Sequence, residues 1–350
     1  MRRQAPTLVV LAVLAVAGGY LAYSQCGTDH APRGATRAAT ASSAIRAGDV
    51  PFTVIAPVGS APPVAPDGAP RLMPFGDGND ALGRGTTPDG RAVAPASFLA
   101  DGSELLVLDQ EKSRLLRTDG TSIPLPGKRA DDVARGADGS LAVLDRLGAK
   151  DVTMLDANGR VRGRLPLEGT GIEDPRDVTR VVVSGNDVLV ERNGGGPFLR
   201  IGGIDGTPAK ERTEIPGMPT RDGTALVSAG ITSEEQGRAW VTLADRVGVH
   251  RWTRELRFPA ELSGVAFLDS DTGPTRTIWT VLLAGSTSAD YINWAVCLDV
   301  TTGAVRGSFS LAVENPPWES FRDFAVKDDG TLLAATRTDR GVTYASYPCP

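Results

Sequence analysis

Carboxylate side chains recur in the sequence directly before short apolar runs. Asp132, Asp177 and Asp323 each precede such a run, and Arg176 and Arg322 stand beside two of them. If these runs are strands around a shared centre, the carboxylates form part of one ring. Two readings are open. In the first interpretation, the ring of carboxylates binds either Ca²⁺, which takes about six to eight oxygen ligands, or a basic group on a partner. Alternatively, each aspartate caps its own turn and the adjoining arginines compensate the charge.

The sequence contains few residues that could support other kinds of catalysis. The only two histidines are His30 and His250, so a histidine-based zinc site or a Ser-His-Asp arrangement cannot be assembled. His250 lies in an alternating segment and reads as an ordinary strand residue. A phosphate-binding loop is also absent from the sequence. We therefore predict no catalytic residues and no cofactor, except Ca²⁺ under the first reading of the aspartates.

The charge and cysteine content narrow the partners and the compartment. The net charge is −5 with both signs scattered, and without a basic stripe nucleic acid is not an expected partner. The three cysteines include no CxxC pair. Cys297 and Cys349 are a candidate disulfide in an oxidising compartment, provided that their Cα atoms come within about 7 Å.

The N-terminal segment, residues 1–26, has the pattern of an export signal. Arg2 and Arg3 precede an uncharged apolar run from Thr7 to Tyr23. The run reads equally as a cleaved signal peptide and as a single membrane anchor. If it is retained, the arginines keep the N-terminus in the cytoplasm and place the rest outside. We expect an exported protein, either anchored on the periplasmic side of the inner membrane or secreted.

The next segment, residues 27–70, is rich in alanine, proline and glycine and has few large apolar residues. Such a composition buries too little surface to offset the entropy of ordering, which favours a disordered tether. Residues 71–350 are then the folded domain.

This domain is predicted to be all-β because it repeats a pattern of short apolar strands separated by glycine turns. Units begin near residues 97, 132, 177, 226, 264 and 323. Each fits a four-stranded antiparallel meander, and six such units predict a six-bladed β-propeller. The last unit has three strands, so we expect residues 71–75 to complete it and close the ring.

The best-defined units also resemble a known family. The segments 75–84, 95–98 and 107–109, followed by Ser113 and Arg114, resemble the NHL-repeat branch of six-bladed propellers, within the NHL-repeat and TolB-like superfamily. The resemblance implies a propeller fold for residues 71–350.

Two functions remain compatible with this pattern. The first is a binding or scaffolding propeller of the cell envelope that holds a protein, peptide or glycan, with the membrane as a further contact if the N-terminal segment is uncleaved. The alternative is a Ca²⁺-dependent lactonase-like hydrolase, a class that resembles this architecture and carries carboxylates in the central channel. The alternative requires three or more oxygen ligands to converge on the axis.

Overall fold

The structure is a computed structural model. It describes residues 55–57, 64–86, 92–102, 104–127, 130–194, 197–247, 249–271, 275–285, 291–313 and 320–349. All of them belong to one compact unit, residues 44–350. The expected signal or anchor segment, 1–26, lies outside the described residues. Within those residues, no helix has the length and apolar character needed to cross a membrane.

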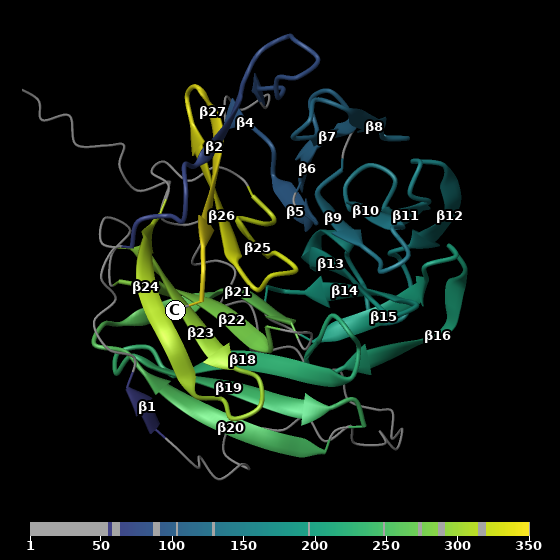
Figure 1. The fold of residues 1–350 in the computed structure, drawn as a ribbon. Helices are drawn as coiled ribbons and strands as arrows, with labels where there is room; N and C mark the ends of the chain where they lie inside the picture. The colour runs from purple at the N-terminus through teal and green to yellow at the C-terminus, as the bar shows by residue number, and fades with distance from the viewer. Residues whose placement is uncertain are drawn as a thin grey trace, which may run out of the picture. The chain divides into compact units, whose positions relative to one another are not determined.

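The domain consists of six antiparallel sheets of four strands each, and blade 4 carries one further strand (Figure 1). This confirms the predicted all-β fold of six four-stranded blades. Blades 1 to 3 are formed by β5 (Ser97–Asp101), β6 (Glu104–Asp109), β7 (Arg114–Arg117) and β8 (Ser122–Pro124); β9 (Asp132–Arg135), β10 (Leu141–Asp145), β11 (Asp151–Leu155) and β12 (Val161–Pro166); and β13 (Val178–Ser184), β14 (Asp187–Arg192), β15 (Phe198–Gly203) and β16 (Pro208–Ile215).

Blades 4 to 6 follow in chain order. They are formed by β17 (Met218–Pro219), β18 (Ala225–Ser233), β19 (Arg238–Asp245) and β20 (His250–Arg257); β21 (Leu262–Asp271), β22 (Thr277–Ala284), β23 (Ile292–Asp299) and β24 (Val305–Ala312); and β25 (Phe324–Val326), β26 (Leu332–Thr338), β27 (Gly341–Tyr347) and β2 (Arg71–Pro74). A short pair, β3 (Gly85–Thr86) with β4 (Ala92–Val93), and a 3-10 turn at Pro175–Asp177 complete the described elements.

The apolar core lies between the blades. Successive side chains of a strand point to opposite faces, so a strand with a blade on each side must be apolar at every position. In β6, Leu106 and Leu108 pack towards blade 2, whereas Leu105 and Val107 pack towards blade 6. Six separate clusters of buried residues result, one for each pair of neighbouring blades. A single blade could not bury both of its faces, which is why the blades must stack into a ring.

The first strands of the blades line the centre. β5 lies beside β9, β9 beside β13, β21 beside β25, and β25 beside β5. The last blade is completed from the other end of the chain, because β2 pairs antiparallel with β27 over Arg71 to Tyr344 and Pro74 to Gly341. Met73 is buried between blades 6 and 1. The segment expected to close the ring therefore lies in the closing position.

Blade 4 differs from the sequence expectation. Its first strand is the two-residue β17, and the residues near 226, where we expected the unit to begin, form the second strand, β18. A strand of two residues is too short to show a periodic pattern of apolar residues. The start of this blade therefore could not be predicted from the sequence.

The segment expected to be a disordered tether contributes a strand. β1 (Ile55–Pro57) adds in parallel to the outer edge of blade 4, pairing Ile55 with Glu255 and Pro57 with Arg257. Residues 27–54 and 58–63 lie outside the described residues.

Candidate functional site

The centre of the ring is crossed by a buried ion pair. Asp132, at the start of β9, is fully buried, and Arg322, before β25, donates to both of its carboxylate oxygens at 3.1 and 2.9 Å. The Ser97 hydroxyl and the Val181 N–H donate to the same carboxylate at 2.5 and 2.9 Å. Blades 1, 2, 3 and 6 thus meet at one carboxylate.

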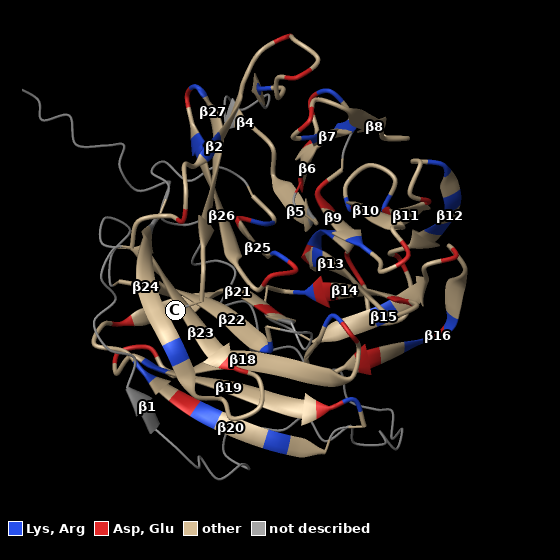
Figure 2. Cartoon of the chain, in the orientation of Figure 1, with Lys and Arg blue, Asp and Glu red and all other residues tan. Residues whose placement is uncertain are grey.

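The positive charge of Arg322 is stabilised by nearby carboxylates. Burial by itself would lower the pKa of its guanidinium group, but Asp132, together with Asp269 and Glu191, raises it above the ordinary value. Arg322 also donates to the Val181 carbonyl at 3.1 Å. Acidic and basic residues are interspersed around the first strands in Figure 2, in keeping with this pairing.

A second buried arginine was not anticipated from the sequence. Arg180 of β13 is 8% exposed, and it donates to the Leu268 carbonyl at 3.2 Å. Its Nε lies 3.9 Å from a carboxylate oxygen of Glu191, and its guanidinium group lies 5.5 Å from the ring centroid of Phe267. An arginine in the valine-rich run 178–183 was the available signal, because a charged side chain in a largely buried strand needs a partner.

A third arginine contacts the C-terminal ends of two first strands, β21 and β25. Arg221, in the turn between β17 and β18, lies 3.2 Å from Asp269 and 3.4 Å from Asp328. It also donates to the Val326 carbonyl. The charged groups along the centre are therefore bound to one another across several blades, an arrangement that holds the blades together.

The three aspartates singled out in the sequence have different partners. Asp132 binds Arg322, whereas Asp323 accepts hydrogen bonds from Arg337 at 2.7 Å and from the Ser320 hydroxyl at 2.8 Å. Asp177 binds through its main chain, with its carbonyl accepting from the Asn193 N–H at 2.8 Å.

The two arginines singled out beside these aspartates each bind an aspartate that is not their immediate neighbour in sequence. Arg322 binds Asp132, and Arg176 binds Asp174. Side chains that are adjacent in an extended chain point in different directions, so a neighbour in sequence is a poor partner for an ion pair.

The exposed pair Asp174–Arg176 gives a titration that can be predicted. Hydrogen bonds from the Arg176 side chain and backbone lower the pKa of Asp174 to about 2. Since the unfolded value is near 3.8, the unfolded chain binds the proton more readily. The stabilisation is therefore present above about pH 4 and lost as the pH falls towards 2.

Carboxyl ¹³C NMR should show Asp174 titrating near 2 in the wild type and closer to 3.8 in Arg176→Ala. The thermal midpoint of Arg176→Ala should then fall less steeply than the wild type between pH 4 and 2. An unchanged Asp174 titration in the variant would refute the assignment.

The structure does not assemble a calcium site from these residues. No group of three or more carboxylate, histidine or cysteine side chains that could hold a metal ion occurs in the described part of the chain. The oxygens of Asp132 are occupied by Arg322, Ser97 and a backbone N–H, which a cation would have to displace. The donor set that the hydrolase alternative requires is therefore not found among these residues.

The candidate disulfide is formed in the structure. Cys297 of β23 and Cys349, beyond β27, are bonded with their Cα atoms 5.9 Å apart. Cys297 is fully buried between blades 5 and 6, where Tyr347 stacks on Phe309 with ring centroids 5.3 Å apart. The bond holds the C-terminal end of the chain against blade 5.

Comparisons with known proteins found only distant structural likenesses. No family model matches the chain, and no curated protein matches it. A protein of unknown function from Bacteroides caccae is 15% identical with a TM-score of 0.39, covering 64% of this chain and 87% of that one. BamB from Moraxella catarrhalis is 14% identical with a TM-score of 0.33, covering 78% of each chain. Hsv2 from Kluyvelomyces marxianus is 10% identical with a TM-score of 0.41, covering 72% and 97%.

Likenesses at this level carry no argument about function. The propeller assignment rests on the sheets themselves, and the resemblance to NHL repeats stays a prediction.

Proposed function

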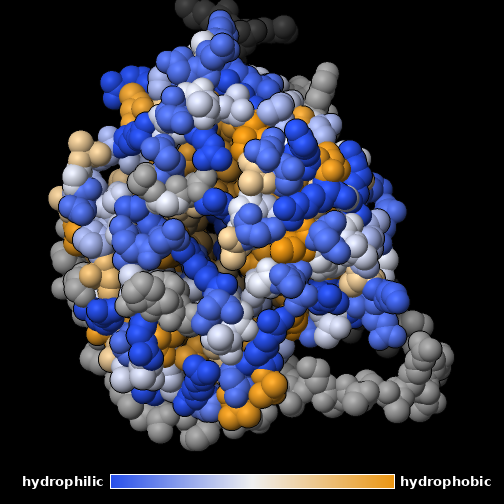
Figure 3. Space-filling model, turned by 45° about the vertical axis from the view of Figure 1, so that its right-hand side comes forward, coloured by the Kyte–Doolittle hydropathy of each residue, from blue (hydrophilic) through white to orange (hydrophobic). Residues whose placement is uncertain are grey.

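We propose that this protein is a binding or scaffolding propeller of the cell envelope that holds a protein or peptide partner. The observation that supports this most directly is the Arg322–Asp132 pair, which joins blades 6 and 2 through the centre of the ring. An ion pair that joins blades across the centre makes the ring rigid. Rigid scaffolds of this kind carry their binding residues on the surrounding loops and grooves. Figure 3 shows one hollowed face whose surroundings are mainly hydrophilic.

The compartment is part of the proposal. A disulfide between Cys297 and Cys349 persists in an oxidising environment and is rare in a reducing cytosol. The arginines and apolar run at the N-terminus have the pattern that directs a chain out of the cytoplasm. Both features support export to the cell envelope.

Photo-crosslinking in living cells tests the proposal with the full chain. A photoreactive amino acid is placed in turn at exposed apolar positions on blades 2, 4 and 6: Leu72, Leu147, Val161 and Val247. We expect at least one position to give a discrete crosslinked product that persists in the presence of a calcium chelator. Absence of a product at every position would contradict the proposal, and so would chelator-sensitive lactone hydrolysis that disappears in Asp132→Asn.

A further inference from the structure

A hollow lies on the outer side of the ring, where the outer strand of blade 3 meets the connection from blade 2 to blade 3. It is lined by Gly169 and Thr170 of this connection and by residues 209–212 of β16. Its volume is about 390 Å³, within the range of about 300–1,000 Å³ that ligand sites occupy. Both walls belong to stretches that the structure describes without a gap, residues 130–194 and 197–247.

The strand β16 is irregular beside this hollow. The register of its pairing with β15 shifts between Arg200 and Gly202, which leaves residues 209–212 outside the regular ladder. Bulges at sheet edges change the direction of side chains and recur next to functional sites. The bulge here directs Arg212 towards the connection that leaves blade 2.

Main-chain carbonyls at the end of β12 and in the connection hold the guanidinium group of Arg212. Its Nη1 and Nη2 atoms donate to the carbonyls of Pro166, Leu167, Glu168 and Thr170, at 2.6, 2.7, 3.0 and 3.5 Å. Its Nε atom makes no hydrogen bond within the described part of the chain. The carbonyls orient the guanidinium group, but they carry no net charge that would neutralise it.

Among the residues that the structure describes, no carboxylate forms an ion pair with Arg212. Burial lowers the pKa of its guanidinium group, and none of the described carboxylates offsets this effect. At Arg322, by contrast, Asp132 raises the pKa. A partly desolvated cation without an anion favours the binding of one.

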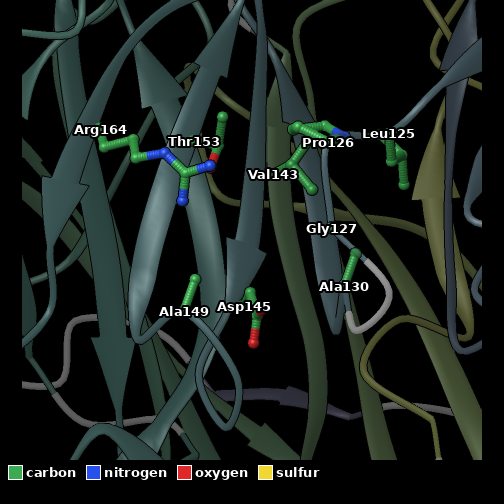
Figure 4. A pocket seen from close by; sticks show the side chains of 9 residues that line it. All are labelled: Leu125, Pro126, Gly127, Ala130, Val143, Asp145, Ala149, Thr153 and Arg164. Atoms are coloured by element: carbon green, nitrogen blue, oxygen red, sulfur yellow. The ribbon is translucent and has the colours of Figure 1, made fainter.

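Arg164 of β12 shows how the charge of an arginine is compensated on the neighbouring blade. It lines a smaller hollow, of about 120 Å³, between blades 1 and 2 (Figure 4). Its Nη1 atom donates to one oxygen of Asp151 at 2.9 Å, and the Thr153 hydroxyl donates to the other oxygen at 3.0 Å. Arg164 therefore already has an anion, which distinguishes it from Arg212.

Gly169 leaves one face of the Arg212 guanidinium group uncovered. A Cβ atom at this position would lie 3.3 Å from Cζ and 3.4 Å from both Nη1 and Nη2. The backbone φ of Gly169 is +135°, which residues with a side chain rarely adopt. The connection therefore packs against the arginine without a side chain that would cover its cation.

Three further polar groups line the hollow. The exposed Lys210 ammonium group and the Thr170 hydroxyl have no hydrogen-bond partner among the described residues. Glu211 is also exposed, but it does not affect the pKa of Arg212. The two cations outweigh this one carboxylate, so the lining has a net positive charge. The basic residues of β16 are blue in Figure 2.

We propose that this hollow binds the carboxylate of an acidic side chain on a protein partner, between the Arg212 guanidinium group and the Lys210 ammonium group. Arginine grips phosphate groups through pairs of parallel N–H donors, and the Nη donors of Arg212 are already used by carbonyls, which favours the smaller carboxylate. This inference rests on the proposed function and specifies the chemistry of the partner.

Methyl NMR titration of the full chain tests the site with a defined probe. N-acetyl-glutamate methylamide should shift the methyl signals of Thr170 and Ala209, which line the hollow. N-acetyl-glutamine methylamide has nearly the same shape without the charge, and it should bind about tenfold more weakly. Equal binding of the two probes would overturn the proposal.

The variants leave Arg212 in place, because this residue also holds the connection between blades 2 and 3. Lys210→Gln removes one exposed positive charge and should weaken binding of the glutamate probe about tenfold. Glu211→Gln removes a carboxylate that repels the probe and should strengthen its binding. An unchanged affinity in Lys210→Gln, or weaker binding in Glu211→Gln, would contradict the assignment.

The matched control is Arg251→Gln. Arg251 is an exposed residue of β20 on blade 4, and it has no ion pair in the described part of the chain. This variant changes the net charge by the same amount as Lys210→Gln, and it should bind the glutamate probe as the wild type does. An equal loss of affinity in both variants would show that the overall charge attracts the probe, and the site would fail.

Inorganic sulfate tests for another kind of anion. It should bind more weakly than the glutamate probe at the Thr170 and Ala209 methyl groups. Tighter binding of sulfate would assign the hollow to a sulfated or phosphorylated ligand and overturn its assignment to an acidic side chain.

The crosslinking and the probe titration can fail separately. If crosslinking captures a partner but the glutamate probe does not bind, the carboxylate site fails and the binding function stands. If the probe binds but no position crosslinks, the proposed function fails.

Discussion

Replacing Arg322 with methionine is expected to lower the free energy of unfolding by about 3–5 kcal/mol, because it leaves the carboxylate of Asp132 buried without its charged partner. Asp132 is fully buried, and its remaining donors are a hydroxyl from Ser97 and the N–H of Val181. These donors do not neutralise a full negative charge. The measurement is the shift in the urea midpoint, followed by circular dichroism.

The matched control is Arg176→Met. The Arg176 side chain is 73% exposed, so breaking its pair with Asp174 should leave the urea midpoint almost unchanged. The double variant Asp132→Leu with Arg322→Met should recover part of the lost stability, since it removes both buried charges together. A single Arg322 variant as stable as the Arg176 variant would show that the pair through the ring is not structural.

Breaking the disulfide is the second change with a large expected effect. The bond closes a loop with a sequence separation of 52 residues, and the chain-entropy treatment gives about 4 kcal/mol for a loop of that length. Cys349→Ala should therefore lower the thermal midpoint markedly. The physical reason is that the unfolded chain gains conformational freedom when the bond is absent.

Reductant supplies the control for this variant. Wild-type protein treated with dithiothreitol should fall to the stability of Cys349→Ala, and the variant should not fall further. Cys26→Ala removes the third cysteine and should leave the midpoint unchanged. A wild-type protein that is insensitive to reductant while unfolded in denaturant would contradict the prediction.

The blades that were predictable from sequence are those in which every strand is long enough to show its pattern. In blades 1 and 2, apolar strands such as Leu105–Leu108 and Leu141–Leu144 alternate with Asp-Gly turns at regular intervals. Blade 4 was misread because β17 has only two residues. Its place in the sheet is decided by pairing of Met218 with Val227, which no local pattern reveals.

The centre of the ring was only partly predictable. The positions of Asp132 and Arg322 before first strands marked them as residues near the axis, but the bond between them joins residues separated by 190 positions. Arg180 and Arg221 were not singled out, because their partners Leu268, Glu191 and Asp269 lie on other elements. Pairing of this kind depends on which side chains the closed ring brings within hydrogen-bond distance.

The sequence by itself determined that this chain forms four-stranded units of short apolar strands separated by turns. The strands are apolar because each of them packs against a neighbouring blade on both of its faces. The sequence also marked the aspartates and arginines at the starts of the first strands. Only the tertiary structure decided which of these charges pair. Closure of the ring brings Arg322 to Asp132. The reason is that an ion pair depends on distance in space, which the folded ring sets independently of distance along the chain.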